Sequence, residues 1–283
     1  MPDAPVLIGA HRLPGTLTVP KGARGLVLFA HGSGSSRHSQ RNLHVAALLQ
    51  AHGLATLLFD LLSAQEGQDR GHVFNIPLLA RRLAEAVDWA GRQQALAHLP
   101  LGLFGASTGA AAALTTSVLR PQRIHAIVSR GGRPDLAAAV LPSVTAPTLM
   151  IVGGADLDVL DLNQQAIARM RAPVRLKVIP GATHLFEEPG TLDRVALLAA
   201  QWFRDHAPTA LGLQAGTGRE ALIDQPEPAE RRQRRDRRLW PRPATAGRSF
   251  ADSPAVTLPG VGSALSGTPP GRPAVTQLFK DGR

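Results

Sequence analysis

Ser107 is the residue of this chain whose surroundings best fit it for chemistry. It lies in Gly105-Ala106-Ser107-Thr108-Gly109, directly after the apolar run 100–104 and directly before the alanine-rich run 110–114. A turn this tight between a strand and a helix pushes the serine hydroxyl away from the backbone, and only small residues fit around it. The pattern indicates a nucleophilic serine, provided that a base and an acid follow it.

A carboxylate and an imidazole do follow, in that order. Asp156 follows the apolar run 148–152 after Gly153-Gly154-Ala155, and His184 follows the run 175–179 after four residues. The imidazole of such a pair takes the serine proton, and the carboxylate holds the ring in the required tautomer. Because parallel strands end at one edge of a sheet, we expect Ser107, Asp156 and His184 to meet there.

Each of these residues also has a simpler interpretation. Ser107 fits a packed turn, His184 a surface loop, and Asp156 a cap on the helix that follows it. Asp158, and more weakly Asp161, are alternative acids, but the Gly-x-x-Asp register favours Asp156.

Backbone donors for a developing oxyanion are expected on two segments. One donor is the amide of Thr108, which follows the serine, and we assign the other to the amide of Ser33 in the glycine- and serine-rich loop 31–36. His31 is expected to hold this loop in place.

Two arginines are candidates for substrate binding. Arg37 follows the loop 31–36 and Arg130 follows the run 124–129, so both are expected at the rim of the site. A guanidinium there would favour a substrate with a carboxylate or phosphate. The alternative is solvated charge or helix capping, and Asp60 is likewise expected to cap a turn.

Alternation of apolar runs with amphipathic segments predicts an α/β fold with about eight mostly parallel strands and helices on both faces. Pro14-Gly15 predicts the turn of an edge hairpin, and the helical period is clearest at 79–90 and 195–203. Only one helix fits between 129 and 148, so the chain has no room there for a further domain over the sheet, and we expect an open site. The strand candidates are 6–8, 16–19, 26–30, 55–59, 101–104, 124–129, 148–152 and 175–179.

Composition separates a body with alternating apolar and amphipathic segments, 1–207, from a tail, 208–283. The chain has 283 residues, a formal net charge of +10 and no cysteine, which excludes disulfides and thiolate metal sites. Pro, Gly, Ser, Thr and Arg dominate the tail, so we expect it to be disordered. Six of the eight residues 231–238 are arginine. This run offers nucleic-acid binding by counterion release, but its proline-rich flanks favour a solvated tail. No membrane-length apolar stretch and no secretory signal at 1–5 are visible, and we expect a cytoplasmic protein.

Residues 6–207 resemble the α/β-hydrolase fold, and within it the dienelactone-hydrolase-like branch, in particular small bacterial members sometimes fused to a phosphoribosyltransferase domain. The resemblance implies Ser107 as nucleophile, Asp156 as acid and His184 as base. Dienelactone hydrolase itself uses a cysteine nucleophile, which this chain lacks, and no phosphoribosyltransferase-like segment is visible. The motifs that carry the resemblance are His31-Gly32-Ser33-Gly34-Ser35-Ser36-Arg37, the serine motif, Ser129-Arg130-Gly131-Gly132-Arg133-Pro134-Asp135 and Gly181-Ala182-Thr183-His184-Leu185-Phe186.

The function expected from these residues is hydrolysis of a small carboxylic ester, thioester or lactone through an acyl-enzyme, without metal or cofactor. The same residues serve acyl transfer when water is excluded, and a binding or regulatory protein on a hydrolase scaffold is a further alternative. A short-chain dehydrogenase is excluded because the chain has no tyrosine and the glycine-rich turn follows about the fifth strand.

Overall fold

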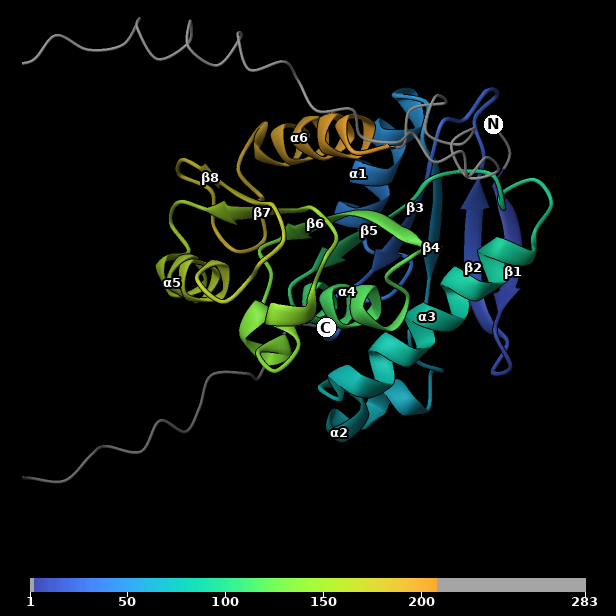
Figure 1. Ribbon diagram of the computed structural model, residues 1–283, viewed down its shortest axis with the longest axis horizontal. Helices are drawn as coiled ribbons and strands as arrows, with labels where there is room; N and C mark the ends of the chain where they lie inside the picture. The colour runs from blue at the N-terminus through green and yellow to red at the C-terminus, as the bar shows by residue number, and fades with distance from the viewer. Residues whose placement is uncertain (1–2, 208–283) are drawn as a thin grey trace, which may run out of the picture. The chain divides into compact units, whose positions relative to one another are not determined.

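Near-continuous apolar runs form the centre of the sheet, because strands buried on both faces need apolar side chains on both sides. The computed structural model describes residues 3–207, so the expectations for the tail 208–283, its arginine run included, lie outside the described residues. Eight strands form one sheet in the order β1-β2-β4-β3-β5-β6-β7-β8 (Figure 1). Their bounds are β1 Ala4–Ile8, β2 Leu13–Thr18, β3 Leu26–Ala30, β4 Ala55–Phe59, β5 Leu101–Ala106, β6 Ile124–Arg130, β7 Thr148–Gly153 and β8 Val174–Ile179.

The six strands from β3 to β8 are parallel to one another, whereas β2 runs antiparallel to both β1 and β4. The mostly parallel eight-stranded sheet confirms the fold expected from the sequence. Since β3, β5, β7 and β8 are parallel, the loops that follow them leave the sheet at one edge.

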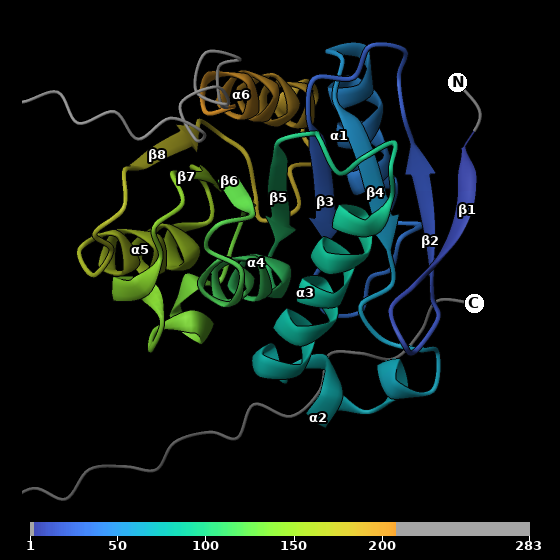
Figure 2. The same cartoon turned by 45° about the vertical axis from the view of Figure 1, so that its right-hand side comes forward.

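Helices cover both faces of the sheet (Figures 1 and 2). The helices α1 Gln40–Ala51 and α6 Thr191–Asp205 pack against each other on one face. The other face carries α3 Ile76–Arg92, α4 Thr108–Leu119 and α5 Leu157–Ile167. The apolar face expected along 79–90 is buried in α3, and α6 buries Val195, Ala199, Trp202 and Phe203.

The first two strands form the expected edge hairpin, but its turn is not at Pro14-Gly15. Both residues lie inside β2, opposite Leu7 and Val6. The chain reverses between Gly9 and Arg12, both of which have positive φ. Gly9 takes this left-handed conformation without steric cost, which makes it the better turn residue.

The connection between β6 and β7 also differs from the expectation. Instead of one helix it contains two short 3-10 turns, Pro134–Ala137 and Leu141–Ser143. A proline near the start of each turn fits its first positions, where no backbone N–H is needed. The connection is too short to hold a cap domain, and the segment 60–75 lines a cavity beside the loop 31–36. This segment contains the 3-10 turn Glu66–Gln68 and the short helix α2 Arg70–Val73.

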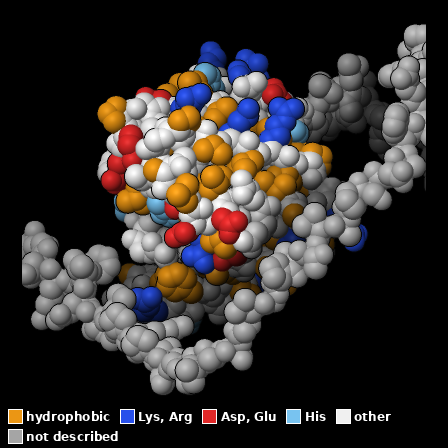
Figure 3. Space-filling view, turned by 90° about the vertical axis from the view of Figure 1, so that its left-hand side faces the viewer, with side chains coloured by type: hydrophobic (Ala, Val, Ile, Leu, Met, Phe, Trp, Pro, Cys, Tyr) orange, Lys and Arg blue, Asp and Glu red, His pale blue; other side chains and the backbone are white. Residues whose placement is uncertain are grey.

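The surface at the β8 end of the sheet is mixed in character. Figure 3 shows apolar side chains spread among polar and charged ones there. No helix within residues 3–207 has the length and apolarity that a bilayer span requires.

Candidate active site

Ser107 lies at a strained turn between β5 and α4. Its backbone has φ 51° and ψ −120°, a conformation that residues other than glycine rarely adopt. A Cβ at Gly109 would lie 2.1 Å from the carbonyl oxygen of Ala30, and one at Gly105 would lie 2.5 Å from the Cα of Ala110. The small residues around the serine are therefore required by packing, as the motif predicts.

The loops after β5, β7 and β8 bring Ser107, Asp156 and His184 into one hydrogen-bonded row. The carboxylate Oδ2 of Asp156 lies 2.7 Å from Nδ1 of His184, and the ring's Nε2 lies 3.3 Å from Oγ of Ser107. In the neutral ring, Nδ1–H donates to the carboxylate, which leaves Nε2 as acceptor for the serine hydroxyl. The arrangement is suited to removing a proton from Ser107.

The structure separates Asp156 from its alternatives. Asp156 is the N-cap residue of α5, but its side chain makes no capping hydrogen bond and binds His184 instead. Asp158 lies exposed in the first turn of α5, and the side chain of Asp161 binds Gln165. Only Asp156 of these three contacts the imidazole.

The two segments expected to supply backbone donors lie side by side. The amide of Ser33 donates to the side-chain hydroxyl of Thr108 at 2.9 Å. The hydroxyl of Thr108 was not assigned this role from the sequence, although a hydroxyl residue directly after the serine is visible there. It holds the Ser33 amide next to the start of α4.

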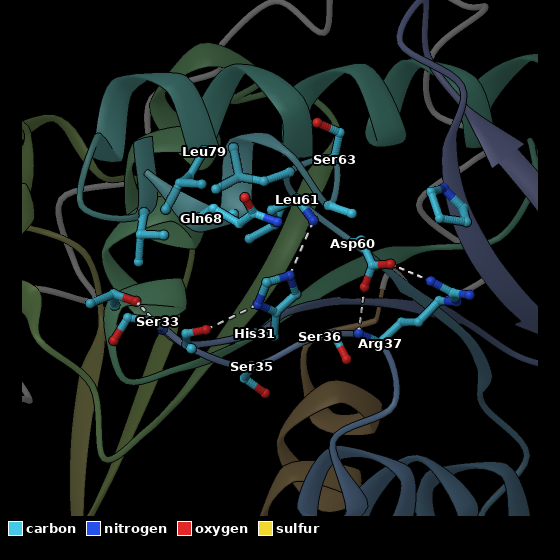
Figure 4. Close-up of a pocket in the computed structure, with 18 residues that line it drawn as sticks. His31, Ser33, Ser35, Ser36, Arg37, Asp60, Leu61, Ser63, Gln68 and Leu79 are labelled. Atoms are coloured by element: carbon cyan, nitrogen blue, oxygen red, sulfur yellow. Dashed lines mark hydrogen bonds and ion pairs between the residues drawn. The ribbon is translucent and has the colours of Figure 1, made fainter. Parts of the chain in front are cut away.

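His31 fixes the loop 31–36 from within. Its Nδ1 lies 3.0 Å from the carbonyl oxygen of Gly32, and its Nε2 accepts from the amide of Leu61 at 3.1 Å (Figure 4). Burial lowers the pKa of His31, so the ring stays neutral and can accept at Nε2. The structural role expected for this residue is confirmed.

Two cavities meet at this loop, and both are lined by Gly32, Ser33 and Ser35. The apolar cavity, of about 480 Å³, is also lined by Thr108 and by apolar residues of the segment 60–75 and α3. The basic cavity, of about 230 Å³, is also lined by Ser107, His184 and two arginines. Further lining residues are Leu61, Leu62, Val73 and Leu79 in the apolar cavity, and Arg41, Asn42 and Arg130 in the basic cavity.

Arg37 lines the apolar cavity but already has a partner. Its guanidinium forms an ion pair with Asp60, and the same carboxylate accepts from the Arg37 amide at 2.7 Å (Figure 4). Asp60 thus caps this turn, as expected. The positive charge of Arg37 is neutralised at this wall.

Arg130 lies in the basic cavity, and no carboxylate among the described residues is within ion-pair distance of it. Its side chain is buried, its Nη2 donates to Asn42 Oδ1 at a long 3.4 Å, and its Nε has no hydrogen-bond partner. The guanidinium lies 5.8 Å from the centre of the Phe186 ring. Burial and, to a lesser degree, the charge of Arg41 lower the pKa of Arg130 to about 10, so the group is still protonated at neutral pH.

Comparisons with known proteins agree with this fold. A family model described as serine aminopeptidase, S33, matches residues 21–133. A crystal structure named dienelactone hydrolase, from Anabaena variabilis, is 51% identical and covers 73% of this chain and 98% of its own, with a TM-score of 0.70. Est1E from Butyrivibrio proteoclasticus, at 15% identity and a TM-score of 0.61, shares the fold.

Two Mycobacterium tuberculosis proteins are also similar. One is named "Putative phosphoribosyl transferase Rv0571c" and is 56% identical over 204 residues, 72% of this chain and 46% of that protein. This chain therefore spans about half the length of that relative. The other, "Uncharacterized protein Rv2307c", is 31% identical over 63% of this chain and 69% of its own length.

Proposed function

We propose that this chain, which belongs to the α/β-hydrolase superfamily and is dienelactone hydrolase-like, is a serine hydrolase that cleaves a small carboxylic ester, thioester or lactone. The observation that carries this proposal is the hydrogen-bonded row of Asp156, His184 and Ser107 at a strained turn. No metal or cofactor takes part in the proposed reaction.

In this mechanism His184 takes the proton of Ser107 while Oγ attacks the substrate carbonyl. The tetrahedral oxyanion accepts hydrogen bonds from the amides of Thr108 and Ser33, each worth about 3 kcal/mol in the transition state. The Ser33 amide exchanges the Thr108 hydroxyl for the oxyanion as the substrate binds. His184 then protonates the leaving group, and afterwards activates the water that releases the acid from the acyl-enzyme.

Hydrolysis is favoured over acyl transfer by the exposure of the base. The side chain of His184 is 37% exposed, so water has access to the acyl-enzyme. The mycobacterial relative named putative phosphoribosyl transferase is matched over 46% of its own length, so its name does not assign a transferase activity to this chain.

A fluorophosphonate probe tests the proposal on the full chain. We expect one covalent adduct per molecule, located on Ser107 by peptide mapping, because only an activated serine reacts with such probes. Ser107→Ala should lose the adduct and lower hydrolysis of 4-nitrophenyl esters by more than about 10⁴-fold. Ser143→Ala, at an exposed serine in a 3-10 turn, is the matched control and should be labelled like the wild type. A folded protein that takes up no probe at Ser107 contradicts the proposal and favours a binding or regulatory role.

A further inference from the structure

Arg130 is a buried cation, and within residues 3–207 no carboxylate lies within ion-pair distance of it. In the same part of the chain its Nε has no hydrogen-bond partner, and the one side-chain hydrogen bond of Arg130, to Asn42, is long. Burying a charge is unfavourable unless the charge is paired, and the contact with the ring of Phe186 offsets only part of that cost. Since Arg130 lines the cavity that contains Ser107 and His184, an anion bound there would supply the missing partner.

A second arginine faces the same cavity from α1. Arg41 forms an ion pair with Glu187 at 3.2 Å through Nη1, and its buried Nε has no hydrogen-bond partner in the part of the chain that the structure describes. The two like charges of Arg41 and Arg130 lie close enough to affect each other, and an anion between them would relieve this repulsion. The neutral polar residues that line the cavity, Ser35, Ser39 and Asn42, add hydrogen-bonding groups.

We propose that Arg130, assisted by Arg41, binds an anionic group on the leaving alcohol or thiol of the substrate, and that the apolar cavity holds the acyl group. This inference rests on the proposed hydrolase function and names its substrate class: an ester or thioester of an apolar acid with a leaving group that carries a carboxylate or a phosphate.

The position of His184 assigns the two cavities to the two halves of the substrate. When Ser107 attacks, the bond from Oγ to the carbonyl carbon forms and the serine proton moves to Nε2 of His184. The bond from that carbon to the leaving oxygen or sulfur then breaks, and the leaving atom takes the proton from Nε2. The leaving group must therefore lie beside His184, which lines the basic cavity and is absent from the lining of the apolar cavity.

The walls of the apolar cavity suit the acyl half. This cavity begins at Ser33 and Thr108, the residues expected to hold the carbonyl oxygen, and continues to Leu61, Val73 and Leu79. The acyl group stays attached to Ser107 after the alcohol has left, so it needs a pocket of its own. Arg37 and Asp60 also line this cavity, but they neutralise each other in an ion pair, so they offer no unpaired charge to an acyl group.

Three chromogenic esters separate the two halves of the substrate. They are 4-nitrophenyl hexanoate, which is neutral; 3-carboxy-4-nitrophenyl hexanoate, with the anion on the leaving group; and 4-nitrophenyl hydrogen adipate, with the anion at the end of the acyl chain. At constant ionic strength we expect the wild type to prefer the second ester over the first by about tenfold or more in kcat/KM, since charged hydrogen bonds discriminate strongly.

Substitution of Arg130 tests the origin of this preference. Arg130→Met should lower the ratio of kcat/KM for the second ester to that for the first by about 10- to 100-fold, and Arg130→Lys should retain part of the ratio. Arg120→Met, which removes an arginine paired with Asp88, is the matched control and should keep the wild-type ratio. Competitive inhibition by benzoate and by phenyl phosphate distinguishes a carboxylate from a phosphate as the preferred anion.

The outcomes separate this inference from the proposed function. If Ser107 reacts with the fluorophosphonate probe but Arg130→Met leaves the ratio unchanged, or if the wild type prefers the adipate ester, the assignment of Arg130 is wrong and the hydrolase function stands. If Arg130→Met does not fold, the wild-type preference among the three esters and the inhibition by the two anions still decide the assignment. If Ser107 takes up no probe, the proposed function itself fails.

Discussion

Arg37 and Arg130 lie on the two cavities that meet at the loop 31–36, and they have opposite surroundings. Arg37 is partly exposed and held by Asp60. Arg130 is buried and has no carboxylate partner among residues 3–207. A charge that the protein has already neutralised does little for ligand binding, whereas an unbalanced buried charge favours an anion strongly. This contrast is the basis of the proposal that the two halves of the substrate differ in charge.

In the proposed mechanism one base, His184, serves both halves of the substrate, so a change in the proposed acid should affect all three esters alike. Asp156→Asn should lower kcat by about 10³- to 10⁴-fold on each of them, because Nδ1 of His184 loses the carboxylate that sets its tautomer. Asp158→Asn, at an exposed position in the same helix, is the control and should stay within about twofold of the wild type. Steady-state kinetics measure both. A strong loss in Asp158→Asn with little loss in Asp156→Asn would reassign the acid.

Filling the apolar cavity should change the preference for the acyl group and leave the preference for the leaving group intact. Val73 lines this cavity from α2 and is half-buried, so a larger side chain can occupy the cavity there. Val73→Trp should lower kcat/KM for 4-nitrophenyl octanoate relative to the acetate by about 10-fold or more. Phe74→Trp, at the neighbouring exposed position, should not. Equal losses on both esters would show that the acyl group lies elsewhere.

Releasing Arg37 from its partner should make the apolar cavity resemble the basic one. In Asp60→Asn the side chain can still accept from the Arg37 amide, but the guanidinium loses its counter-charge. We expect kcat/KM for 4-nitrophenyl hydrogen adipate to rise by up to about tenfold relative to the hexanoate, on the order of 1 kcal/mol. The double variant Asp60→Asn with Arg37→Met should lose this gain. No gain in Asp60→Asn would mean that the acyl end does not reach Arg37.

The sequence was sufficient for the sheet and for the positions of the three strand-end loops, because buried parallel strands and a strand–turn–helix serine have distinct patterns. It was insufficient where the answer depends on contacts across the fold. Arg37 and Arg130 are both arginines, so the sequence alone does not distinguish them. Only the structure shows that Asp60 pairs with Arg37, whereas no described carboxylate pairs with Arg130.

The predictions of a turn at Pro14-Gly15 and of one helix after β6 were wrong, because both structures depend on contacts with distant parts of the chain. Pro14-Gly15 is a common turn pair, but its place inside β2 is set by pairing with β1 and β4. The hydroxyl of Thr108 was missed because its partner, the Ser33 amide, lies 75 residues away in the chain. Whether Ser33 and Thr108 serve as oxyanion donors stays a prediction.

His31 holds the loop 31–36, which lines both cavities, in place through hydrogen bonds with Gly32 and Leu61. Protonation of Nε2 should break the hydrogen bond from the Leu61 amide and so destabilise the loop. Because burial lowers the pKa of His31 in the folded state, the unfolded chain binds a proton that the folded chain does not, once the pH falls below about 6.5. The free energy of unfolding should therefore be lower at pH 5.5 than at pH 7, in part because of this residue. His31→Gln, which can still accept from the Leu61 amide, should lower stability at pH 7 but remove this part of the pH dependence. Urea unfolding of both proteins at the two pH values measures the difference, and parallel curves would show that His31 can be protonated without disturbing the loop.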